Sequence, residues 1–163
     1  MSELSRVLII EDQIGDVLWL VDLIRSRGYE VVLATNEEAA RKLLEAVSRG
    51  QESYALAIMD VAVAIKDLQD LIALDEQFFE DSVNTGIRLC RYARQKLGLS
   101  PERLPIVCLT VRDDEEVKAA MEDLQIPLFN KAPQSQSESI RGFIEDRVPV
   151  RATSAAFWEA AAQ

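Results

Sequence analysis

Short apolar runs alternate with longer amphipathic stretches along most of this chain. Five runs of strand length carry few or no polar residues, at residues 7–10, 29–34, 54–60, 105–109 and 127–129. A run without polar alternation is typical of a strand that is buried on both faces of a parallel sheet. Strand and helix patterns alternate five times, and this alternation predicts an α/β fold with a doubly wound, five-stranded parallel sheet.

The stretches between the runs have the features of helices. Residues 17–24 place apolar side chains three and four residues apart, which is the spacing of one helix face. Thr35 with Glu38, and Asp113 with Glu116, form capping patterns that predict helices running to about residues 47 and 124. Two further helices are expected at residues 86–97 and 138–146.

The order of the strands decides which side chains meet. Right-handed crossovers with helices on both faces leave few orders for five strands, and the commonest is the flavodoxin-like order 2-1-3-4-5. In that order the first and third strands are neighbours, and their carboxyl ends flank the crevice where open α/β sheets bind ligands. The order therefore predicts that the polar residues at the strand ends converge there, namely Glu11, Asp12, Asp60, Thr110 and Lys131.

Composition and charge narrow the classes of partner. The 163 residues fit one domain, predicted as residues 1–148 with a tail at 149–163, and 48% of them are hydrophobic. With 28 acidic against 18 basic residues the formal net charge is -10, which argues against a nucleic-acid partner or an anionic membrane. No run is long enough to cross a bilayer and the start lacks the features of a secretion signal, so we expect a cytoplasmic protein.

The residue types limit the chemistry further. The chain has no histidine, which excludes imidazole catalysis and the usual zinc sites. Cys90 and Cys108 lie within apolar patterns and are interpreted as small buried thiols rather than as a disulfide or a metal pair. Chemistry is therefore left to carboxylates, hydroxyls, lysine or a hard metal ion.

The predicted crevice brings three carboxylates together. Such a group repels itself and either holds protons or recruits a cation. Oxygen ligands from Glu11, Asp12 and Asp60, completed by water, suit Mg²⁺ better than a transition metal. With the Thr110 hydroxyl and the Lys131 ammonium beside the ion, these parts match phosphoryl transfer in which Asp60 attacks in line and becomes an acyl phosphate.

These residues resemble the site of the receiver (CheY-like) domain of two-component response regulators. The matching elements are the acidic pair Glu11 and Asp12, the phosphoacceptor Asp60, Thr110 and Lys131, in a stretch from about residue 6 to residue 147. The resemblance implies a Mg²⁺-dependent phosphorelay step in which a histidine kinase or a histidine phosphotransfer protein donates the phosphoryl group.

The resemblance also implies how such a domain signals. The main-chain carbonyl of Ala62 would be a further metal ligand. The phosphoryl group would bias a two-state surface made by the fourth helix, the fifth strand and the fifth helix, which binds a downstream protein partner. Such a domain is a signalling phosphoacceptor and not an enzyme. Nothing after residue 150 is large enough to be an output domain, so we expect a stand-alone regulator.

Three positions depart from the usual receiver pattern. The lysine is usually followed by proline in a cis bond, whereas this chain has Lys131-Ala132-Pro133. Val111 stands where a small residue is usual and would narrow access to Asp60. The position of the aromatic switch, three residues before the lysine, is Leu128, with Phe129 next to it. The rotamer switch of the family would then be altered or absent.

The largest departure is the segment 61–84. Gly86, which opens the next helix, lies 26 residues after Asp60, about fifteen to twenty more than a short loop needs. Residues 67–80 have the period of an amphipathic helix with a strongly acidic side. The segment is either an extra helix on the domain edge or a lid or docking element. Its apolar side would pack on the third helix or on a second copy of the chain, as in a homodimer, and its acidic side would face solvent or Arg88 and Arg91.

Two smaller features have alternative interpretations. Arg112 would pair with phosphate or with the acidic segment, or it is a solvated loop arginine. Phe157 and Trp158 in the tail belong to an unordered end or to a small docking patch, and the first is favoured.

Two functional classes fit the whole chain. The first is a receiver that is switched by phosphorylation, and the second is a pseudo-receiver, an interaction module that keeps the fold without this switch. The presence of all five site residues favours the first. A hydrolase with an Asp-x-Asp motif is excluded because Ala62 occupies the second position, and a flavin-binding flavodoxin because Glu11 and Asp12 would repel the flavin phosphate.

Overall fold

A five-stranded parallel sheet forms the centre of the computed structural model, which describes residues 6–63, 84–112, 114–131 and 134–151. The strands are β1 (Arg6–Ile10), β2 (Glu30–Ala34), β3 (Leu56–Met59), β4 (Ile106–Thr110) and β5 (Leu128–Asn130). Their order in the sheet is β2-β1-β3-β4-β5, and all four pairings are parallel. The predicted fold class and strand order are confirmed.

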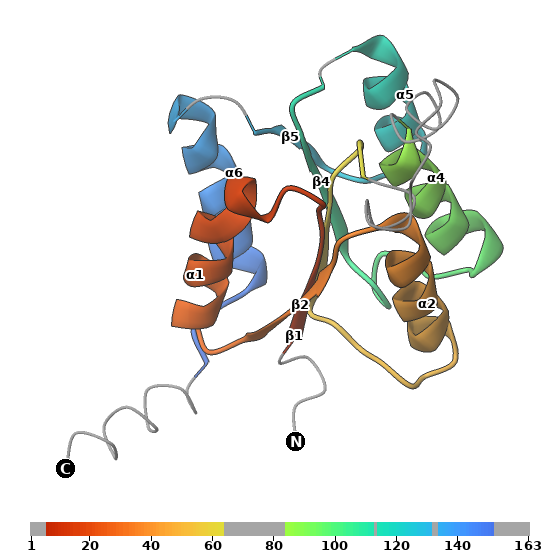
Figure 1. The fold of residues 1–163 in the computed structure, drawn as a ribbon, viewed down its shortest axis with the longest axis horizontal. Helices are drawn as coiled ribbons and strands as arrows, with labels where there is room; N and C mark the ends of the chain where they lie inside the picture. The colour runs from red at the N-terminus through yellow and green to blue at the C-terminus, as the bar shows by residue number, and fades with distance from the viewer. Residues whose placement is uncertain (1–5, 64–83, 113, 132–133, 152–163) are drawn as a thin grey trace, which may run out of the picture.

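Helices cover both faces of the sheet (Figure 1). One face carries α1 (Leu18–Ser26), which follows a 3-10 turn (Ile14–Val17), and α6 (Gln134–Arg147). The other face carries α2 (Glu37–Ser48), α4 (Thr85–Arg91) with its π-helical continuation (Tyr92–Lys96), and α5 (Glu115–Asp123). This arrangement gives the molecule two hydrophobic clusters, one on each side of the sheet.

The central strands supply side chains to both clusters. In β1, Val7 and Ile9 face α1 and α6, whereas Leu8 and Ile10 face the opposite helices. All four are at most 1% exposed, which is why the strand reads as a continuous apolar run. Cys90 and Cys108 are buried free thiols, as the sequence predicts.

The observed helix starts correct three sequence predictions. The N-cap of α2 is Asn36 and not Thr35, and its side chain accepts a hydrogen bond from the first turn at 2.8 Å. The N-cap of α5 is Asp114, with an equivalent bond of 3.2 Å, while Asp113 lies outside the described residues. Asn36 and Asp114 have the extended backbone that a cap requires. The last helix begins at Gln134, earlier than predicted.

Several predictions fall outside the described residues. The helix expected at 67–80 lies within the undescribed residues 64–83. The bond after Lys131 involves Ala132 and Pro133, and the tail prediction involves Phe157 and Trp158, none of which is described. Of the segment 61–84, Val61 and Val63 are described and fully buried. The start of the segment, directly after Asp60, therefore belongs to the core.

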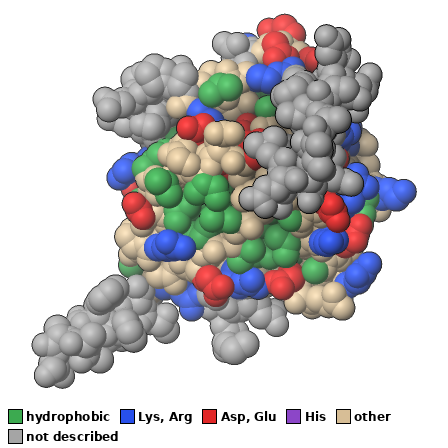
Figure 2. All heavy atoms as spheres, viewed as in Figure 1, with side chains coloured by type: hydrophobic (Ala, Val, Ile, Leu, Met, Phe, Trp, Pro, Cys, Tyr) green, Lys and Arg blue, Asp and Glu red, His purple; other side chains and the backbone are tan. Residues whose placement is uncertain are grey.

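The surface around the edge strand β2 is mixed in character (Figure 2). Hydrophobic side chains gather in the middle of this view, and charged side chains surround them. Leu33 of β2 is 37% exposed, and Trp19 and Val31 are partly buried. In the part of the chain that the structure describes, no helix combines the length and the apolar character needed to cross a membrane.

Candidate metal centre

The predicted site residues lie at the carboxyl edge of the sheet, where main-chain hydrogen bonds hold the strand ends together. The N–H of Asp60 donates to the carbonyl of Ile10 at 3.0 Å, which joins the end of β3 to the end of β1. The N–H of Lys131 donates to the carbonyl of Thr110 at 2.8 Å, which joins the end of β5 to β4. The side chains at these ends therefore stand on a rigid base.

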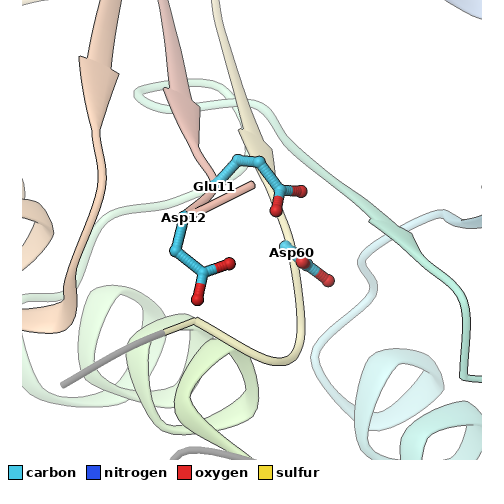
Figure 3. A group of neighbouring side chains, drawn as sticks. All are labelled: Glu11, Asp12 and Asp60. Atoms are coloured by element: carbon cyan, nitrogen blue, oxygen red, sulfur yellow. The ribbon is translucent and has the colours of Figure 1, made fainter. Parts of the chain in front are cut away.

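Three carboxylates converge at this edge (Figure 3). Each of Glu11, Asp12 and Asp60 places an oxygen within 4.8 Å of the oxygens of the other two. Glu11 and Asp12 extend from the end of β1 toward Asp60, which lies beyond the end of β3. Glu11 is 2% exposed and Asp60 is 7% exposed, whereas Asp12 is half-buried. The structure thus brings together the three residues predicted as carboxylate ligands.

The ammonium of Lys131 bridges two of these carboxylates. Its Nζ donates to Oδ2 of Asp60 at 2.9 Å and to Oε2 of Glu11. The second oxygens accept from the main chain, from the N–H of Gln13 to Glu11 at 3.0 Å and from the N–H of Ala62 to Asp60 at 3.4 Å. Among the described residues, therefore, Lys131 is the cation that contacts Glu11 and Asp60.

One lysine does not neutralise this cluster. Burial, and next the negative charge of Asp60, raise the pKa of Glu11 to about 7, although hydrogen bonds from Lys131 and Gln13 oppose the shift. Burial by itself would lower the pKa of Lys131, but the hydrogen bond to Glu11 and the charge of Asp60 outweigh it and raise that pKa. Both shifts favour the protonated form, as expected where negative charge is in excess.

The donor set fits a hard divalent cation. It offers carboxylate oxygens from three residues, and Asp12 is exposed enough for water to complete the coordination. Oxygen donors without nitrogen or sulfur favour Mg²⁺ or Mn²⁺ over softer metals. Ala62 lies beside the cluster, because its N–H contacts Asp60, and its carbonyl stays a predicted ligand.

Thr110 contributes a hydroxyl from the end of β4. Its side chain is fully buried, and its Oγ1 accepts a hydrogen bond from the N–H of Arg112 at 3.2 Å. Because that contact uses the oxygen as an acceptor, the hydroxyl hydrogen is left to donate to another group.

Comparison with known proteins supports the fold. No protein-family model and no curated protein matches the chain. It is similar to the CheY-like receiver domain protein of Methanospirillum hungatei, at 18% identity and a TM-score of 0.59 over 88% of this chain and 96% of that one. It is also similar to the Mn²⁺-bound form of response regulator Rcp1, at 15% identity and a TM-score of 0.63 over 91% and 97%. The HemR receiver domain of Leptospira biflexa matches at 17% identity and a TM-score of 0.58 over 90% and 95%.

The chain has the receiver-domain fold. At these low identities the likeness concerns the backbone alone.

Within the receiver fold, Gly86 is a site residue that the sequence showed only as the start of a helix. A Cβ at this position would lie 2.0 Å from the carbonyl oxygen of Asp60, and the N–H of Gly86 donates to the carbonyl of Val61 at 2.7 Å. The first turn of α4 therefore lies directly on the backbone of Asp60, which only glycine permits. The sequence contains one indication of this close contact: a glycine stands within the first turn of a helix, where the backbone does not need a positive φ.

Arg112 does not extend into solvent, contrary to one of its interpretations from the sequence. Its guanidinium is 19% exposed and contacts Asp114 at 2.8 Å and Asn84 at 2.6 Å. The interpretation of Arg112 as a solvated loop arginine is therefore wrong. These partners lie 2 and 28 residues away in sequence, and the second could not be read from the local pattern.

The two residues at the switch position of the receiver fold face opposite sides of the sheet. Leu128 packs on the cluster beneath α2, α4 and α5, whereas Phe129 packs on the other face, 5.2 Å from the ring of Phe143 in α6. Val111 is 65% exposed. The aromatic ring of β5 thus packs on α6, and Leu128, at the position where the resemblance predicts an aromatic switch, is aliphatic.

Proposed function

We propose that this chain is a receiver whose Asp60 accepts a phosphoryl group from a histidine kinase or a histidine phosphotransfer protein in a Mg²⁺-dependent step. A downstream protein partner recognises the phosphorylated form. One observation carries the proposal. Three carboxylates lie within 4.8 Å of one another, and among the described residues one lysine, 2.9 Å from Asp60, accompanies them. A cation added to this set would leave Lys131 available to an incoming anion.

The proposed transfer is an in-line displacement. A carboxylate oxygen of Asp60 attacks the phosphorus of a phosphohistidine, and a P–O bond forms as the P–N bond breaks. The phosphohistidine reacts with its other ring nitrogen protonated, so the electron pair of the P–N bond stays on the ring and neutral imidazole leaves. The product on Asp60 is a mixed anhydride of carboxylic and phosphoric acid. When bound, Mg²⁺ neutralises charge on the oxygens of the transferred group.

The protein residues would have distinct roles in this step. Glu11 and Asp12 hold the cation together with Asp60, and the carbonyl of Ala62 is an additional ligand. Lys131 exchanges its contact with Asp60 for a phosphoryl oxygen, and the hydroxyl of Thr110 donates to another. Their positions on adjacent strand ends mean that the site is largely preorganised, which is what phosphoryl transfer requires of a protein.

Two solved structures of similar fold support a cation and a phosphoryl group at such a site. One is a Mn²⁺-bound response regulator, and another is a phosphorylated cyanobacterial phytochrome response regulator. The alternative function is a pseudo-receiver, which the aliphatic Leu128 at the switch position and the packing of Phe129 on Phe143 favour.

Intact-mass spectrometry after incubation with phosphoramidate separates the two functions. We expect a single phosphoryl adduct with Mg²⁺, no adduct in EDTA, and none on Asp60→Asn. The exposed Asp22→Asn is a matched control that should be modified like the wild type. A wild-type chain that stays unmodified at millimolar Mg²⁺ would establish the pseudo-receiver.

A further inference from the structure

A polar cluster outside the site lies in the loop after β4 and is centred on Arg112. Its Nε and Nη2 donate to the two carboxylate oxygens of Asp114 at 2.8 and 3.1 Å, which is a forked pair. Its Nη1 donates to Oδ1 of Asn84 at 2.6 Å. The carboxylate of Glu116 is farther away, at 3.7 Å, and is 66% exposed. The guanidinium thus contacts both Asp114 and Asn84.

Arg112 connects three parts of the molecule that border the site. Its main-chain N–H holds the hydroxyl oxygen of Thr110, and its forked pair is with the residue that caps α5. Asn84 immediately precedes α4, the helix whose Gly86 lies on the backbone of the proposed phosphoacceptor. One side chain therefore ties the loop that follows Thr110 to the helix that lies on Asp60.

We propose that Arg112 is a positioning residue for phosphoryl transfer to Asp60. Its guanidinium holds the loop after β4 against the start of α4, so that the Thr110 hydroxyl is already aimed when the phosphoryl group arrives. The inference rests on the proposed function and adds a residue to it. A hydroxyl donor that is already fixed in position stabilises the developing charge without having to reorganise, and this lowers the barrier to transfer.

The chemistry of the contacts explains why an arginine is needed. The guanidinium is planar and reaches a carboxylate with two nitrogens while a third is directed to Asn84. A lysine has a single charged nitrogen and cannot make the fork and the third contact together. Only one-fifth of the side chain is exposed, so water does not replace these contacts freely.

The test compares the rate of phosphorylation by phosphoramidate in full-length variants, with the Mg²⁺ dissociation constant measured in parallel. We expect Arg112→Ala and Asn84→Ala each to slow phosphorylation by about five- to tenfold. The double variant should be no slower than the slower single variant, because both remove one clamp. Arg112→Lys should stay slow, because a lysine cannot make the forked pair and the third contact together.

The controls separate positioning from general damage. Mg²⁺ affinity should be unchanged in all variants, since no contact that the structure describes joins Arg112 or Asn84 to Glu11, Asp12 or Asp60, and a loss of fold would reduce it. Arg49→Ala, an exposed arginine with an i,i+4 partner, should phosphorylate like the wild type.

Three outcomes would overturn the inference. Unchanged rates in Arg112→Ala and Asn84→Ala, with a wild type that is phosphorylated, would remove it and leave the proposed function intact. Slow transfer in Arg112→Ala with a normal rate in Asn84→Ala would mean that Arg112 acts directly on the phosphoryl group and not as a clamp. A wild type that takes no phosphoryl group would remove the proposed function as well. If Arg112→Ala does not fold, Asn84→Ala and Arg112→Lys carry the same test.

Discussion

Two charged clusters near the carboxyl edge of the sheet differ in where their excess charge lies. In the site cluster, the carboxylates of Glu11, Asp12 and Asp60 meet the single ammonium of Lys131. The side chains of Glu11 and Lys131 are only 2% and 10% exposed. The excess charge here is negative and is buried.

The second cluster joins α2 to α4 and has the opposite excess. The carboxylate of Glu37 accepts from Arg88 at 3.0 Å and lies 3.6 Å from Arg41. The carboxylate is 11% exposed, but the two arginine side chains are 37% and 47% exposed. Among the described residues, the excess charge of this cluster is therefore positive and lies on groups that water reaches.

The difference between the clusters separates a structural contact from a binding site. Excess charge that is hydrated costs little and needs no further partner. Excess charge that is buried must be neutralised by a proton or a cation, and the pKa of Glu11, raised to about 7 by burial and by Asp60, shows this demand. The two clusters should therefore respond differently to Mg²⁺ and to pH.

Lys131→Met should have the largest effect, because it removes the positively charged partner of the buried carboxylates. In EDTA at pH 8 we expect the free energy of unfolding to fall by about 3 kcal/mol, the lower end of the cost of breaking a buried pair, since Glu11 can take up a proton. Urea unfolding with and without Mg²⁺ measures it. Mg²⁺ should restore most of the loss, and a loss that persists in Mg²⁺ would contradict the idea that a cation can replace the ammonium.

The pH dependence of stability in EDTA should show the burial of Glu11. Its folded pKa of about 7 lies above the ordinary value of 4.5, so folding favours the protonated carboxyl. The contribution of this group to the free energy of unfolding is fully present below pH 4.5 and is lost as the pH rises through 7. The free energy of unfolding of Glu11→Gln, relative to wild type, should therefore increase by about 2 kcal/mol between pH 5.5 and 8.5. Equal slopes for the two proteins would contradict the shift.

Mg²⁺ should stabilise the wild type by mass action. At ten times the dissociation constant the increment is about 1.4 kcal/mol, measured as a rise in the melting temperature. Asp12→Asn should abolish it, whereas the exposed Asp22→Asn on α1 should keep it. An increment that survives in Asp12→Asn would place the ion elsewhere.

Arg88→Met, in the second cluster, should have the smallest effect. Because the pair with Glu37 is partly exposed, we expect a loss of about 1 kcal/mol or less in urea unfolding. The loss should be the same with and without Mg²⁺, and phosphorylation should be retained. A loss that depends on Mg²⁺ would remove the distinction between the two clusters.

Much of the site cluster could be predicted from the sequence, because it depends on local patterns. Strands buried on both faces appear as apolar runs, and their order fixes which ends are neighbours. Glu11, Asp12 and Asp60 follow directly from those two facts. The helix starts were missed by one residue because Thr35 and Asn36, like Asp113 and Asp114, are both suitable caps, and only the backbone selects one.

The remaining features depend on contacts between distant segments. The approach of Gly86 to the carbonyl of Asp60 depends on where α4 lies on the sheet. The partner Asn84 of Arg112 is 28 residues away and becomes a neighbour only in the folded domain. Residue types and spacing therefore predicted the charged groups of the site but not the packing that positions them.

The central claim, that Asp60 is the phosphoacceptor of a cation-dependent site, is tested most directly by locating the acyl phosphate. Borohydride reduces an acyl phosphate of aspartate to homoserine, which tandem mass spectrometry assigns to one residue. After incubation with phosphoramidate and Mg²⁺, we predict homoserine at position 60 and at no other acidic residue, and none when EDTA replaces Mg²⁺. Homoserine at another position, or no conversion in a chain that binds Mg²⁺, would contradict the claim.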